Sequence, residues 1–170
     1  MNCILQSRGI ILQICNFLEA IDESIYTAPL SLFNQSSVGK HVRHIHGFFE
    51  CLVTASELGV VNYDKRNRDP RIENDPVYCK ISFLEMVPKI EQMDTNKELV
   101  ILSGMHREDQ DLKGAIGSTL GREIIYAFEH ALHHLAIVKM GMRAHYPEIV
   151  LDENMGVAPS TIEYRNSCAQ

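Results

Sequence analysis

The sequence has little of what marks a membrane, secreted or nucleic-acid-binding protein. No apolar run approaches the ~18 residues of a membrane span, and the first residues lack the basic start of a signal peptide. The five cysteines are scattered and include no C-x-x-C pair, which argues against a disulfide framework or a cysteine zinc site. The formal net charge of −6 gives no basic surface for a phosphate backbone. We therefore expect a cytoplasmic protein with no nucleic-acid partner and no membrane partner.

What is present is an ordinary globular composition of moderate length. The chain has 170 residues, of which 45% are hydrophobic and 22% are charged. These proportions exclude a disordered or fibrous chain, and the length fits one domain of about 100 to 200 residues. We predict a single domain over residues 1–170 with one hydrophobic core.

Apolar spacing predicts two helices in the first third of the chain. Residues from Ile4 to Ile25 place their apolar side chains three, four or seven positions apart, and this helix should end before Pro29. A second helix is expected over about 37–58, capped by one of the serines at 36 and 37. Gly59 is its natural stop.

Two more helices are expected in the rest of the chain. One begins at Asp75-Pro76 and is kinked or shortened at Pro88, and the other runs over about 119–140 with Gly141 just past its end. The charged stretch 60–75 reads as a surface connection, and 99–102 as a small strand or an ordered loop. The tail after residue 143 has no clear period. The pattern predicts an all-α bundle with long connections and an irregular C-terminal tail.

Histidine is the unusual feature of the composition. Six of the eight histidines fall in two short clusters, at 41, 44 and 46 and at 130, 133 and 134. On a helix, His130 and His134 lie only about 40° apart in direction, which is the spacing of two ligands for one metal ion. A zinc-peptidase H-E-x-x-H motif is not present, because Ala131 follows His130.

A third ligand must come from the other cluster if the site has three protein ligands and an open position. The candidates are His41, His44 and His46, and their helical phase alone does not choose among them. His44 lies at the edge of the apolar face of its helix, as His130 does on the later helix.

Two motifs resemble the DinB/YfiT-like superfamily of metalloproteins. Residues 36–45, SSVGKHVRHI, are similar to the W-S-x-x-E-x-x-x-H-[LI] pattern that opens the family's second helix. Residues 129–134, EHALHH, contain the H-x-x-H-H pattern of a later helix. Ser36 stands in place of the usual Trp, Lys40 in place of the acidic residue, and Leu135-Ala136-Ile137 in place of the usual R-G-Q.

The resemblance implies an up-down-down-up four-helix bundle with His44, His130 and His134 as the metal ligands. It also implies a bacterial protein with a divalent ion, zinc or nickel first, whose open position activates a thiol or water. The expected activities are S-transferase-like, with a low-molecular-weight thiol as co-substrate, or hydrolase-like. The partner is then a small-molecule substrate, and a homodimer stays open. The alternative is a non-catalytic, metal-stabilised bundle with a binding or stress-related role.

Five further residues are candidates for the surroundings of the site. His41 and His133 are the neighbouring histidines, and Cys51 shares the helical phase of His44, although a buried core cysteine is its commoner role. Arg66 and Arg68 could bind an anionic substrate through their guanidinium groups, against the alternative of a solvated loop.

No obvious carboxylate base accompanies the histidines in the sequence. Glu50 and Asp109 are the candidates if the fold brings them close, and His106 is expected to be a surface residue.

Overall fold

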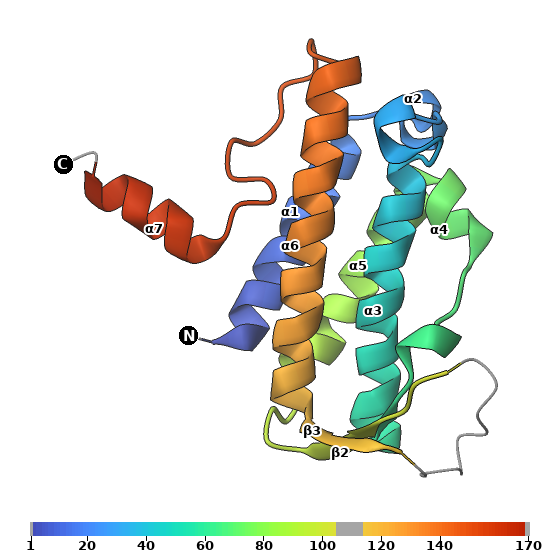
Figure 1. Ribbon diagram of the computed structural model, residues 1–170, viewed down its shortest axis with the longest axis vertical. Helices are drawn as coiled ribbons and strands as arrows, with labels where there is room; N and C mark the ends of the chain where they lie inside the picture. Colours follow the sequence, from blue (N-terminus) through green and yellow to red (C-terminus); the bar gives the residue numbers. More distant parts are fainter. Residues whose placement is uncertain (1, 105–113, 169–170) are drawn as a thin grey trace.

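A computed structural model describes residues 2–104 and 114–168, and this part of the chain is mostly helical. It contains seven α-helices and a small three-stranded sheet (Figure 1). The predicted all-α class is thus roughly confirmed, and the short strands, which join helices at one end of the molecule, are an addition to it. Within the described residues, no helix combines the length and the apolar character needed to cross a membrane.

Four long helices form the body of the molecule. They are α1 (Cys3–Glu19), α3 (Val38–Leu58), α5 (Pro76–Glu91) and α6 (Leu120–His145). Both α1 and α3 pack against α5 and α6, and apolar side chains from all four fill one core. Figure 1 shows α1 and α6 running in one direction and α3 and α5 in the other.

The first predicted helix is in fact two helices. The α1 helix ends at Glu19, and α2 (Glu23–Thr27) starts a new turn. The physical reason is Asp22, whose carboxylate accepts a hydrogen bond from the backbone N–H of Ile25 and so caps α2. Apolar periodicity continues across this break, which is why it does not reveal the interruption.

The α3 helix, which carries His44, confirms the predicted boundaries. The Ser37 side chain accepts from the Lys40 N–H at its start, and Gly59 ends it with a positive φ of 72°. Glycine adopts this left-handed conformation without steric cost, so the C-terminal stop follows directly from the residue type.

The stretch 60–75 is more ordered than a surface connection. It contains β1 (Val60–Val61), a 3-10 turn η2 (Tyr63–Lys65) and α4 (Pro70–Asn74), with Val61 and Ile72 buried. Strand β2 (Glu98–Ile101) pairs in parallel with β1 and antiparallel with β3 (Ile116–Thr119). The strand alternative for residues 99–102 is thus confirmed, and η2 is fixed beside α3.

Two predictions at the C-terminal end are wrong. The α6 helix continues through Gly141 to His145. Gly141 does not end the helix; its missing side chain makes room for a neighbouring residue. A Cβ atom at Gly141 would lie 2.1 Å from Cζ of Phe33, in the short turn η1 (Ser31–Phe33). The tail is also not wholly irregular, since α7 (Pro159–Cys168) forms there and projects away from the other helices in Figure 1.

Helix α5 passes through its proline. Asp75 caps it and Pro76 occupies its first turn as predicted, but the helix continues beyond Pro88 to Glu91. The expected shortening at Pro88 is therefore not observed.

Candidate metal centre

Helices α3 and α6 bring three histidines together. His44 lies on α3, and His130 and His134 lie one turn apart on α6. One ring nitrogen from each lies within 4.8 Å of the other two, and each side chain is half-buried. Three imidazoles converging in this way could hold one divalent metal ion.

The ring nitrogens face one another directly. Nε2 of His44 lies 2.7 Å from Nε2 of His130, and Nδ1 of His41 lies 3.1 Å from Nδ1 of His134. The rings of His44 and His134 are 4.6 Å apart between centroids. In each hydrogen-bonded pair one nitrogen donates and the other accepts, so the cluster holds lone pairs that a metal ion can use.

Burial keeps these histidines neutral. Desolvation, reinforced by the positive charge of Arg66, lowers the pKa of His44 to about 4. Desolvation and the neighbouring rings lower the pKa of His134 to about 3, and burial also lowers the pKa of His130. Because a metal binds only the deprotonated imidazole, the three residues fit a divalent ion at neutral pH without first releasing protons.

An aromatic stack holds one of the ligands. Phe48 stacks on His130 with 4.1 Å between centroids, and Tyr63 stacks on the other side of Phe48 at 4.7 Å. The Tyr63 hydroxyl donates to the buried carboxylate of Glu123 at 2.9 Å, and the Ser118 hydroxyl donates to the same carboxylate at 2.7 Å. This network restricts the ring of His130 before any ion binds.

The stack includes residues that the sequence analysis missed. Phe48 lies four positions after His44, and this spacing could have indicated contact with the same site. Tyr63 reaches the stack only because η2 folds back along α3, and no local pattern indicates that contact.

Arg66 reaches the centre from the segment after η2. Its Nη2 donates to Nδ1 of His44 at 3.1 Å, and its Nη1 donates to the Tyr63 carbonyl at 2.8 Å. The guanidinium carbon lies 5.8 Å from the centroid of Phe48. The side chain crosses α3 at Gly47, where a Cβ atom would lie only 3.1 Å from Cδ of Arg66.

The other residues predicted to surround the site are not metal ligands in the structure. His41 contacts His134 but is not one of the three converging ligands. His133 is exposed, and its ring meets the His134 ring edge-on with 5.6 Å between centroids. Arg68 is exposed and makes no ion pair within residues 2–104 and 114–168. Cys51 does not join the histidines: its thiol donates to the Asn62 carbonyl at 3.9 Å, and burial raises its pKa to about 11.

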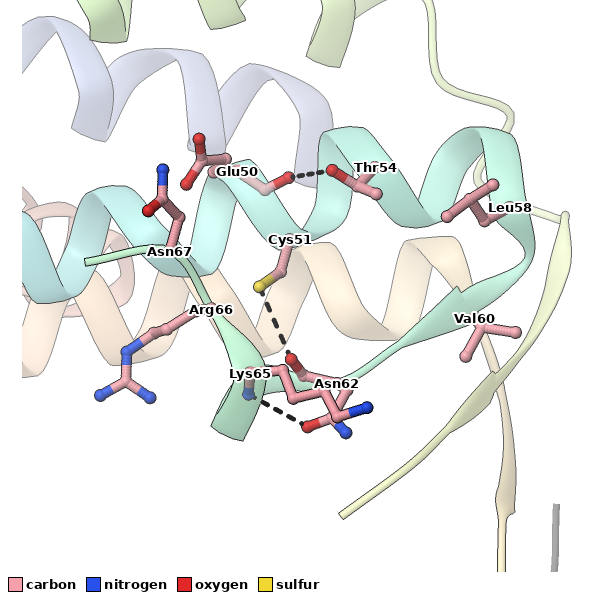
Figure 2. Close-up of a pocket in the computed structure, with 9 residues that line it drawn as sticks. All are labelled: Glu50, Cys51, Thr54, Leu58, Val60, Asn62, Lys65, Arg66 and Asn67. Carbon is pink, nitrogen blue, oxygen red and sulfur yellow. Dashed lines mark hydrogen bonds between the residues drawn. The ribbon is translucent and has the colours of Figure 1, made fainter. Parts of the chain in front are cut away.

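Cys51 instead lines a cavity of about 490 Å³ between α3 and the segment that follows β1 (Figure 2). Glu50 also lies on this cavity and not among the histidines, whereas Asp109 and His106 fall outside the described residues. In Figure 2 the Arg66 side chain extends away from Cys51, so it borders the cavity while its guanidinium reaches His44.

Comparison with known proteins adds one relative. No family model and no solved structure match the chain. The chain is similar to FK506-binding protein 5 of Rhizopus delemar, with 32% identity over 110 residues. The alignment covers 62% of this chain and 27% of that protein, so the chain matches about a quarter of the relative's length. This similarity assigns the chain to no family.

Proposed function

We propose that the chain is a DinB-like four-helix-bundle metalloprotein that holds one divalent ion, zinc or nickel, through His44, His130 and His134. The observation that carries the proposal is the convergence of these three neutral side chains from α3 and α6. The directions of α1, α3, α5 and α6 follow the up-down-down-up order of that superfamily (Figure 1).

We propose further that the site is catalytic, with a small-molecule substrate and a low-molecular-weight thiol as co-substrate. A bound divalent ion with an open position lowers the pKa of a thiol or water. The chain supplies neutral nitrogen ligands, an aromatic wall of Phe48 and Tyr63, and a guanidinium at Arg66. A cytoplasmic location fits this role, and the net charge of −6 disfavours a nucleic-acid substrate.

One observation favours a second candidate, a metal-stabilised bundle without catalysis. Within the described residues, no carboxylate hydrogen bonds to the three histidines. The nearby buried carboxylate, Glu123, already accepts from Tyr63 and Ser118. Thiol transfer needs less from a general base than hydrolysis does, because thiols ionise more readily than water, and we therefore prefer the thiol-dependent activity.

A paired comparison tests the catalytic proposal. The metal-loaded protein is screened with low-molecular-weight thiols and electrophiles, beside His134→Ala and the matched control His133→Ala. We expect thiol consumption by the parent and by the exposed-site control, and none by His134→Ala. Metal binding without turnover of any thiol would instead support the non-catalytic candidate.

A further inference from the structure

We propose that Arg66 is the anion-binding residue of this centre, so that the preferred thiol or substrate carries a carboxylate or similar acidic group. This inference rests on the proposed metal-dependent function and adds a substrate class to it.

The first observation is that Arg66 forms no ion pair in the part of the chain that the structure describes. It is half-buried and donates only to neutral acceptors, the Tyr63 carbonyl and His44. Among residues 2–104 and 114–168 it forms no ion pair, whereas Arg43 pairs with Glu73 and Arg71 pairs with Asp69. A partly desolvated cation without an anion is costly, and an acidic ligand would supply the missing charge.

The second observation is the hydrogen bond to His44. A guanidinium can only donate, so Nδ1 of His44 accepts and its ring hydrogen lies on Nε2, facing His130. When Nε2 serves as a metal ligand, the ring hydrogen lies on Nδ1 instead. Two donors then face each other, and Arg66 loses His44 as a hydrogen-bond partner beside the metal centre. The guanidinium must turn to another acceptor.

The third observation is the geometry of the Arg66 guanidinium. The bond from Nη1 to the Tyr63 carbonyl anchors one side of the fork. The remaining N–H groups can bind a carboxylate through two parallel hydrogen bonds.

Two small thiols provide the test. Mercaptoacetate carries a carboxylate and mercaptoethanol carries a hydroxyl, and binding of each to the Co²⁺-loaded protein is followed by the thiolate-to-cobalt charge-transfer absorption. We expect the parent to bind mercaptoacetate at least about tenfold more tightly, as expected of a charge-assisted hydrogen bond. Arg66→Met should lose most of that preference, Arg66→Lys should keep part of it, and Arg68→Met should keep it all.

The matched variants separate the explanations. Chelation of cobalt by the carboxylate itself would give a preference that survives in Arg66→Met, and this result would overturn the role of Arg66. An equal loss in Arg68→Met would also overturn it, since general charge would then be responsible. Absence of cobalt binding in the parent would refute the proposed metal function itself, which is a different and recognisable outcome.

Metal affinity gives an independent readout. Because Arg66 stabilises the His44 tautomer with its hydrogen on Nε2, which an ion bound at Nε2 must displace, and because Arg66 repels a dication, Arg66→Met should bind Co²⁺ more tightly than the parent in calorimetric titration. Weaker binding by a variant with unchanged helicity would show that Arg66 merely supports the site, and would overturn the inference.

Discussion

Burial determines the protonation of the central histidines. His44 and His134 stay neutral at pH values well below the ordinary histidine pKa. His46, which lies outside the metal centre, behaves in the same way. His46 is only 6% exposed, its Nε2 lies 2.7 Å from the Ser82 hydroxyl, and burial lowers its pKa to about 4. In the folded protein these three histidines therefore remain unprotonated at mildly acidic pH.

The acid sensitivity of the metal-free protein follows from these pKa values. The unfolded chain binds protons at these histidines below about pH 6.5, whereas the folded chain binds them only near pH 4 or below. The free energy of unfolding should therefore fall as pH falls through this window. The variant His46→Gln can keep a hydrogen bond to Ser82. In urea unfolding, its free energy of unfolding should change less steeply with pH than that of the parent, by up to about 1.4 kcal/mol per pH unit.

The exposed-site variant His133→Gln is the control for this measurement and should keep the parent's slope. If His46→Gln also keeps the parent's slope, the claim that burial keeps His46 neutral in the folded protein is contradicted.

At the scale of elements, the sequence predicts helix ends that local residues determine, but not those that depend on packing between distant residues. The bounds of α3 were predicted because Ser37 and Gly59 act locally, through a cap and a left-handed residue. Gly141 carries the same residue type but serves a contact with Phe33, more than a hundred positions away, so a C-terminal stop was wrongly predicted.

The residues of the candidate site likewise include some that the sequence predicts and some that it does not. The pair His130 and His134 was readable because one helical turn places them together. The choice of His44 over His41 depended on the resemblance, since phase alone left it open. The contact of Arg66 with His44 depends on how η2 folds back, which no local pattern records.

Two glycines on helices allow a direct test of this packing explanation. Gly141→Ala should destabilise the protein by about 1–3 kcal/mol, because its Cβ would overlap the Phe33 ring. Gly9→Ala on α1 has no atom within 4 Å of the added Cβ, and it should stabilise by up to about 1 kcal/mol through helix propensity. Urea unfolding of both variants measures the difference, and stabilisation by Gly141→Ala would contradict the packing role.

At the scale of the whole molecule, one core joins the four long helices. Large apolar side chains from every long helix are fully buried, among them Ile11, Phe49, Phe83 and Ile124. A core of this kind can support the fold of a chain of 170 residues without a structural ion.

Chelation should therefore leave the fold in place. After metal removal, circular dichroism should retain most of the helical signal, with a lower melting temperature. The reason for the lower temperature is mass action: an ion present at about a hundred times its dissociation constant stabilises the folded state by ~2.7 kcal/mol. Loss of all helical signal on chelation would make the ion structural and would weaken the proposal of an open catalytic position.

The most direct test of the central claim is the metal content of three purified proteins: the parent, His44→Ala and His41→Ala. Both variants remove one imidazole from the same face of α3, and both lost rings contact an α6 ligand. If His44, His130 and His134 hold the ion, elemental analysis should find one divalent ion per chain in the parent and in His41→Ala, and none in His44→Ala. Full occupancy in His44→Ala, with loss in His41→Ala, would contradict this assignment of the ligands.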